Sequence, residues 1–128
     1  MAYLDTSAFV KRIFDEPEAA ALDRFLRDWR RLSSSELLWA EAYRAASRRG
    51  AESLSEMRER LRSVMLVPID TALVRRAATL QPPTLRTLDA IHLATAESMG
   101  SELGVVVTYD ARLAEGARAL GMPVAAPA

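Results

Sequence analysis

The sequence has no cysteine, a single histidine and no long apolar run in its 128 residues. Without cysteine the chain forms neither disulfide bonds nor a thiolate nucleophile, and it cannot ligate zinc through sulfur. No stretch approaches the roughly 18 apolar residues that span a bilayer. An acid already stands at position 5 and no basic stretch precedes an apolar one, so we expect no signal peptide. These features favour a soluble protein of the cytoplasm.

An excess of charge of one sign is also missing, because 17 basic residues balance 17 acidic ones. No global field therefore draws nucleic acid to this chain, and contact with an anionic polymer would need local arginines or bound cations. Every base except Lys11 is an arginine. A guanidinium suits phosphate and carboxylate recognition because its planar fork donates two parallel hydrogen bonds.

Short apolar segments alternate with helical patterns along the chain. We expect strands at residues 3–5, 32–35, 64–69, 105–110 and 123–126. We expect helices at residues 6–14, 17–31, 36–50, 52–62, 70–81, 84–100 and 111–120. Strands separated by helices predict βαβ units, and hence a mostly parallel sheet with right-handed crossovers. The length fits one domain over residues 1–128.

Local signals set several of these bounds. Pro17 fits the first turn of the second helix, and Ser33 with Glu36 forms the capping-box pattern ahead of the third. Thr84 is expected to cap the sixth helix. The segment Val64–Ile69 is nearly continuous in apolar residues, which predicts a strand buried on both faces.

Two acids stand at the carboxyl ends of predicted strands. Asp5 comes at the end of the first strand, and Asp110 comes shortly after the run Val105–Val107. Taken alone, each is explained as a helix N-cap, whose oxygen accepts a hydrogen bond from a free backbone N–H. If the two strands are parallel neighbours, however, their carboxyl ends meet at one sheet edge and bring the two carboxylates together.

Two further acids occupy apolar faces of predicted helices. Glu41 and Asp89 each have apolar residues four positions before and four positions after, so each projects from the apolar side of its helix. An ordinary ion pair is the alternative for both. Glu41 has Arg44 three residues on, and Asp89 has Arg86 three residues back.

Four acids in apolar surroundings predict a bound cation. Clustered carboxylates repel one another and lose solvation, so several in one place are costly unless a positive charge offsets them. A hard divalent ion does so, and oxygen ligands without cysteine and with one histidine favour Mg²⁺ or Mn²⁺ over zinc. Magnesium keeps several waters, which leaves positions open for phosphate oxygens.

The segments LDTSAFVK, WAEAYRA, TLDAIHLATA and VVTYDARLAEGARALGMPV follow one another in this order. Together they resemble the PIN-domain ribonucleases, specifically the VapC-type toxins of bacterial toxin–antitoxin pairs. The resemblance covers nearly the whole chain, and the combination of LDTSA with LDAIHLATA and a downstream V-V-T-x-D is its most specific part. It implies a three-layer α/β/α sandwich with a mostly parallel sheet of four to five strands.

The resemblance also implies a site. The acidic cluster and the hydroxyls that line it correspond to Asp5, Glu41, Asp89, Asp110, Thr6, Ser7 and Thr108. Among these, Asp5, Asp89 and Asp110 are expected to ligate the metal, while Glu41 is either a ligand or an orienter of the attacking water. If Asp5 binds the metal, Thr6 or Ser7 is expected to cap the first helix in its place.

By the same resemblance the protein is a metal-dependent endoribonuclease toxin that inhibits growth until a cognate VapB-like antitoxin binds it, and it forms a homodimer. Metal-assisted hydrolysis is implied, in which a metal-bound water attacks phosphorus in line.

Arg44 and Arg86 are candidate phosphate contacts, with a helix-end surface charge as the alternative. Many relatives carry a further acid where this chain has Arg112, so a second metal position is in doubt more than the first. His92 is expected to pack and hydrogen-bond rather than to act as a general base, because no second histidine accompanies it.

Other classes of protein fit less well. A phosphoacceptor receiver domain needs a lysine near the end of its last strand, whereas Lys11 lies in the first predicted helix. A haloacid-dehalogenase-like phosphatase needs Asp-x-Asp after its first strand, whereas Asp5 is followed by Thr6 and Ser7. The remaining alternative is a catalytically silent PIN-like module that binds a metal or a partner, which an activity assay separates from an enzyme.

Overall fold

The computed structural model describes residues 1–128 and places a parallel sheet at its centre. The strands are β1 (Ala2–Leu4), β2 (Leu32–Ser35), β3 (Val64–Val67), β4 (Val105–Val107) and β5 (Val124–Ala125). Their order is β3-β2-β1-β4-β5, and every neighbouring pair is parallel. The predicted parallel sheet is therefore confirmed, with five strands. The strand order reverses between β1 and β4.

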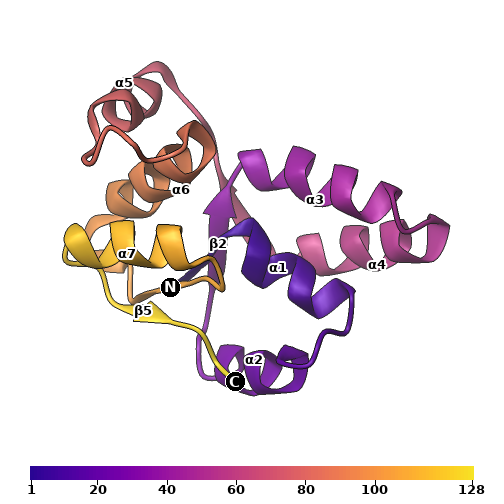
Figure 1. The fold of residues 1–128 in the computed structure, drawn as a ribbon. Coiled ribbons are helices and arrows are strands. Elements are labelled where there is room, and N and C mark those ends of the chain that lie inside the picture. Colours follow the sequence, from indigo (N-terminus) through magenta and orange to yellow (C-terminus); the bar gives the residue numbers. More distant parts are fainter.

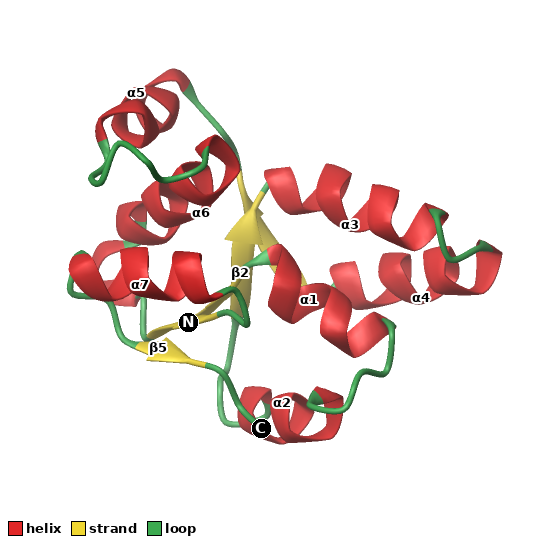
Figure 2. Cartoon of the chain, viewed as in Figure 1, coloured by secondary structure: helices red, strands yellow, loops and turns green.

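Helices cover both faces of the sheet (Figures 1 and 2). They are α1 (Thr6–Ile13), α2 (Ala19–Leu26), α3 (Leu37–Ser47), α4 (Ala51–Leu61), α5 (Thr71–Thr79), α6 (Thr87–Ser98) and α7 (Ala111–Ala119). Figure 1 shows α1 to α4 on one side and α5 to α7 on the other, which confirms the expected three-layer sandwich. None of the helices combines the length and the apolar character needed to cross a lipid bilayer.

Alternation along the central strands supplies both layers of the core. Tyr3 and Val106 pack among residues of α5, α6 and α7, whereas Leu4 and Val107 pack with residues of α1 and α2. All four side chains are fully buried. Successive residues of a strand point to opposite faces, so two short strands are enough to hold two helical layers. The same alternation aims the Tyr3 side chain toward α6.

The starts of α2 and α3 differ from the predictions. Pro17 lies in a turn, and α2 runs only from Ala19 to Leu26. The capping-box prediction is wrong because Ser33 belongs to β2, where it pairs with β1 and β3. The Ser35 hydroxyl instead accepts a hydrogen bond from the first backbone N–H of α3, at 3.0 Å. Strand pairing thus overrides the local capping signal.

Two predictions at the edges of the fold are also wrong. Thr84 does not cap α6, because that helix begins at Thr87 and the cap position is taken by Arg86, which makes no side-chain cap bond. The strand β3 is not buried on both faces, because it forms one edge of the sheet and Met65 is 45% exposed. A run of apolar residues indicates a strand but does not reveal its position in the sheet.

The carboxyl ends of β1 and β4 meet at one edge. These strands pair in register, with Leu4 opposite Val107, so Asp5 and Thr108 emerge side by side. The edge coincides with the reversal of strand order, where open α/β sheets bind their ligands. The two strands are parallel neighbours, so the condition for bringing the Asp5 and Asp110 carboxylates together is met.

Candidate active site

A pocket of about 300 Å³ opens at the carboxyl edge of β1 and β4. All four acids singled out in the sequence line it, namely Asp5, Glu41, Asp89 and Asp110. Two of them are the N-cap residues of α1 and α7, and the other two project from α3 and α6. The structure thus gathers in one pocket acids that are far apart in the chain.

Asp5 is the most buried of these acids, with 3% of its surface exposed. Its Oδ1 accepts hydrogen bonds from the Ala8 backbone N–H at 2.9 Å and the Ser7 hydroxyl at 2.7 Å, and its Oδ2 accepts one from Thr108 at 2.6 Å. Asp5 itself caps α1, so the expectation that Thr6 or Ser7 would take over this role is wrong. Burial raises the pKa of the Asp5 carboxyl above its ordinary value, and the three hydrogen bonds oppose that rise only in part.

Two hydroxyls hold the Asp5 carboxylate to the end of β4. Ser7 Oγ accepts a hydrogen bond from the Tyr109 backbone N–H at 2.9 Å, and Thr108 Oγ1 accepts one from the Asp110 N–H at 3.0 Å. Each hydroxyl therefore uses its lone pair on the backbone and its proton on Asp5. Because both groups are committed in this way, the orientation of the carboxylate is fixed before any ligand binds.

Glu41 is held by a chain of buried groups. Its Oε1 accepts a hydrogen bond from the Thr6 hydroxyl at 2.5 Å and lies 2.8 Å from His92 Nε2. The second ring nitrogen, Nδ1, lies 2.7 Å from the Tyr3 hydroxyl. With the tyrosine donating to Nδ1, the ring proton is assigned to Nε2 and points at Glu41. His92 thus has the hydrogen-bonded packing position that the sequence predicted.

The charge of Glu41 follows from these contacts. Burial by itself raises the pKa of the carboxyl, but the hydrogen bonds from His92 and Thr6 outweigh it and hold the pKa below its ordinary value. Arg44 takes no part, so the alternative of a Glu41–Arg44 ion pair is wrong. Arg44 instead lines a separate shallow pocket with Tyr43.

Arg86 bridges the other two acids. Its Nε donates to Asp89 Oδ2 and its Nη2 donates to Asp110 Oδ2, both at 2.9 Å. The alternative of an Asp89–Arg86 pair is therefore confirmed, but the pair lies inside the acidic pocket instead of on a distant surface. Asp110 also caps α7, because its Oδ1 accepts hydrogen bonds from the backbone N–H groups of Arg112 and Leu113. Asp110 Oδ1 thus faces the start of α7, whereas Asp110 Oδ2 faces Arg86.

The donor set suits a hard cation. The acids supply oxygen ligands only, and Asp89 and Asp110 already hold one positive group between them. In this arrangement, no group of three or more histidine, aspartate or glutamate side chains is placed so that all of them could bind one metal ion. Magnesium needs no such cage, because it binds through one or two carboxylates and keeps its waters. A divalent ion at these acids would take the place of the Arg86 guanidinium.

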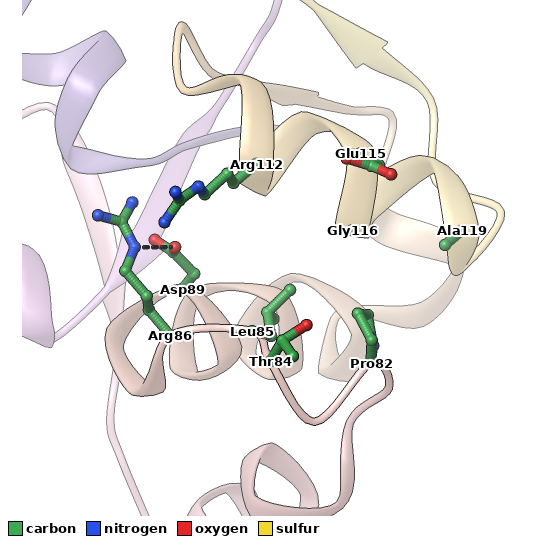
Figure 3. A pocket seen from close by; sticks show the side chains of 9 residues that line it. All are labelled: Pro82, Thr84, Leu85, Arg86, Asp89, Arg112, Glu115, Gly116 and Ala119. Carbon is green, nitrogen blue, oxygen red and sulfur yellow. Dashed lines mark hydrogen bonds and ion pairs between the residues drawn. The ribbon is translucent and has the colours of Figure 1, made fainter.

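Two residues at the site were not identified from the sequence. Tyr3 looks like an ordinary strand residue, and only the packing of β1 against α6 brings its hydroxyl to His92. Arg112 was noted only as a missing acid, yet Figure 3 shows its guanidinium directed toward Arg86 and Asp89. No local pattern in the sequence would have indicated the Tyr3–His92 contact or the direction of the Arg112 side chain.

The fold and the site together define an α/β protein with an acidic pocket at the switch point of a parallel sheet. The sequence model of the PIN domain matches residues 2–119. Ribonuclease VapC46 of Mycobacterium tuberculosis (strain ATCC 25618 / H37Rv) is 45% identical, and the match covers 98% of this chain and 96% of VapC46. Ribonuclease VapC35 of the same strain is 42% identical, and the match covers 99% of this chain and 97% of VapC35. The chain therefore belongs to the PIN-domain family, among the VapC-type ribonucleases.

Solved structures agree with this fold. A toxin–antitoxin complex from Klebsiella pneumoniae contains a chain that superposes with a TM-score of 0.74 at 22% identity, covering 100% of this chain and 98% of that one. VapC20 of Mycobacterium tuberculosis, described as a sarcin–ricin loop cleaving toxin, superposes with a TM-score of 0.73 at 15% identity. The superposition covers 95% of this chain and 96% of VapC20. At these identities the likeness shows the shared fold alone. PIN-domain ribonucleases of the VapC class are generally metal-dependent.

Proposed function

We propose that this protein is the toxin of a toxin–antitoxin pair and acts as an endoribonuclease that depends on Mg²⁺ or Mn²⁺. The observation that carries the proposal is the convergence of Asp5, Glu41, Asp89 and Asp110 in one pocket of a PIN fold. The relatives named as VapC ribonucleases match over nearly the full chain, which supports the same reaction here. The substrate is cellular RNA, of the tRNA, rRNA or mRNA class.

Each acid has a role that its contacts favour. Asp5, Asp89 and Asp110 would hold the ion, one or two of them directly and the rest through its waters, and the ion would supply an activated water and offset charge on the phosphate oxygens. Thr108 and Ser7 keep the Asp5 carboxylate in place. Glu41 is fastened through Oε1, whereas its Oε2 accepts no hydrogen bond within the chain. That free oxygen orients the attacking water and accepts its proton.

The biological setting follows from the same class. We propose a VapB-like antitoxin as the inhibiting partner, a homodimer as the working form, a single domain over residues 1–128 and a location in the cytoplasm. The complexes from Klebsiella pneumoniae and Rickettsia felis, the second titled as VapBC2 bound to a promoter DNA fragment, support the antitoxin partner by their fold. Induced expression should arrest growth, and coexpression of the adjacent small open reading frame should restore it.

Cleavage of RNA by the purified protein tests the enzymatic proposal. We expect the wild type, freed of any partner, to cut total RNA in Mn²⁺ or Mg²⁺ and to lose this activity in excess EDTA. The Asp89→Asn variant, prepared in the same way, controls for contaminating nuclease. Equal cleavage by the two proteins would overturn the proposal and favour a catalytically silent PIN-like module.

Arg86 provides a separate test of the metal position. A divalent ion at Asp89 and Asp110 has to compete with the Arg86 guanidinium, so Arg86→Gln should tighten Mn²⁺ binding about fivefold, as expected for loss of partly exposed ion pairs. Calorimetric titration with MnCl₂ measures this without any RNA. Arg75→Gln, on the exposed side of α5, is the matched control and should bind Mn²⁺ like the wild type. Weaker binding by Arg86→Gln would place the ion elsewhere.

A further inference from the structure

A second pocket, of about 500 Å³, adjoins the acidic site, and apart from Arg86 and Asp89 its lining residues have no part in the reaction described so far (Figure 3). It lies between the segment that leads into α6 and one side of α7. Arg86 and Asp89 line both pockets, so the second pocket opens directly beside the acids. A ligand that reaches the acids can therefore extend into it.

Two charged groups of α7 face this pocket without a partner. Arg112 and Glu115 are both exposed and both line it, and neither side chain forms a hydrogen bond or ion pair within the chain. Residues three apart on a helix commonly pair when their charges are opposite, and these two do not. Figure 3 shows Arg112 reaching toward Arg86 and Asp89, so two guanidinium groups lie at the end of the pocket beside the acids. Glu115 lies farther along.

The wall between these charges is apolar and tightly built. Leu85 and Pro82 form part of it on one side and Ala119 on the other. Gly116 lets α7 approach α6 closely, because a Cβ there would lie 2.7 Å from Leu93 and 3.1 Å from Leu85. The pocket thus combines an anion-binding end, an apolar wall and a carboxylate, which are the elements that recognise a phosphate, a base face and a base edge.

We propose that this pocket binds the nucleotide next to the scissile phosphate, with Arg112 on its phosphate and Leu85 against its base. The inference rests on the proposed RNA cleavage and names a specificity subsite for it. A volume near 500 Å³ lies within the range of small-molecule pockets. Single-stranded RNA is read in this way, through the faces and edges of unstacked bases.

Glu115 decides which base fits. A carboxylate only accepts hydrogen bonds, so it selects a base whose edge presents N–H donors. Guanine offers two neighbouring donors, N1–H and the N2 amino group, which match the two carboxylate oxygens. Uracil presents one N–H flanked by two carbonyl oxygens, which the carboxylate repels. The pocket therefore prefers guanine to uracil.

Binding of mononucleotides followed by NMR tests this inference without catalysis. The ¹⁵N-labelled full-length protein is titrated in EDTA with guanosine 5′-monophosphate and, separately, with uridine 5′-monophosphate. We expect the guanine nucleotide to shift the amide signals of residues 84–86 and 112–119 and to bind more tightly than the uracil nucleotide. Arg112→Gln should weaken its binding about tenfold, the scale expected for losing one hydrogen bond between charged groups. Glu115→Gln should remove the preference for guanine.

The control is Arg118→Gln, which removes the same charge from the same helix outside the pocket and should bind like the wild type. Equal weakening by Arg112→Gln and Arg118→Gln, or shifts that avoid this pocket, would overturn the inference. If a protein segment and no nucleotide occupies the pocket, no saturable shifts appear and the inference fails. A protein that binds the nucleotide here yet cuts no RNA would instead disprove the proposed function and leave a nucleotide-binding pocket without a role in cleavage.

Discussion

Replacing Asp5 with asparagine should lower RNA cleavage by about a thousandfold or more, the scale at which loss of a central electrostatic group affects catalysis. Asparagine retains an oxygen for the Ser7 hydroxyl and the Ala8 N–H, so the N-cap of α1 survives while the negative charge is lost. Single-turnover cleavage of a labelled RNA in Mn²⁺ measures the effect. The result would contradict the proposed role if Asp5→Asn cut RNA at a rate near that of the wild type.

The same variant has an opposite effect on stability. Because burial raises the pKa of Asp5, its stabilising contribution is present below the unfolded-state pKa and is lost as the pH rises through the folded-state pKa. In EDTA at neutral pH, Asp5→Asn should therefore unfold at a higher temperature than the wild type, and the difference should vanish once the pH falls below the unfolded-state pKa of an aspartate. Thermal melts followed by circular dichroism at both pH values test this. Added Mn²⁺ should raise the melting temperature of the wild type more than that of the variant.

Replacing His92 with alanine should lower kcat for RNA cleavage by about 10- to 100-fold, which is typical when a group that orients an active-site carboxylate is lost. The change leaves Glu41 and the buried Tyr3 hydroxyl without their shared partner. It should also reduce the free energy of unfolding by about 2–3 kcal/mol, because a buried hydroxyl is orphaned. Steady-state cleavage kinetics and urea denaturation measure the two effects.

Tyr3→Phe is the graded control for this chain of hydrogen bonds. It removes only the hydroxyl that contacts His92 Nδ1, so we expect a smaller loss of about 1 kcal/mol in stability. The fall in kcat should be smaller than for His92→Ala, and KM should be unchanged in both variants because both side chains are buried. A large rise in KM with unchanged kcat would show that His92 serves binding and does not position Glu41.

Much of the fold is predictable from local signals because those signals act over short distances. The strands at Val105 and Leu32 and the helix that starts after Asp70 lie where their patterns indicate, since apolar runs and N-caps depend on neighbouring residues. The capping prediction for Ser33 failed because pairing with β1 and β3 placed it within a strand. The prediction that β3 is buried on both faces failed because β3 lies at the edge of the sheet. The order of strands depends on how the chain crosses over between them, which a short apolar segment does not indicate.

The acidic pocket was predictable in its members but not in its contacts. Asp5 and Asp110 each follow a strand, and the apolar residues before each acid can be recognised in the sequence. The pairing of Arg86 with Asp89 follows from their spacing on one helix turn, whereas the second Arg86 bond, to Asp110, was not predictable because it joins α6 to the start of α7. The link from Tyr3 to His92 likewise depends on how β1 packs against α6.

The sequence by itself determined the chemistry of this protein: which groups carry charge, that the candidate metal ligands are carboxylate oxygens, and that strands and helices alternate. Periodicity and side-chain type are properties of the chain, so they can be read without coordinates. Only the tertiary structure decided which acids share a pocket, that Asp5 keeps its cap as well as facing the site, and that Arg112 and Glu115 face a second pocket. Those outcomes depend on the order of strands and the packing of helices, which juxtapose residues that are distant in the sequence.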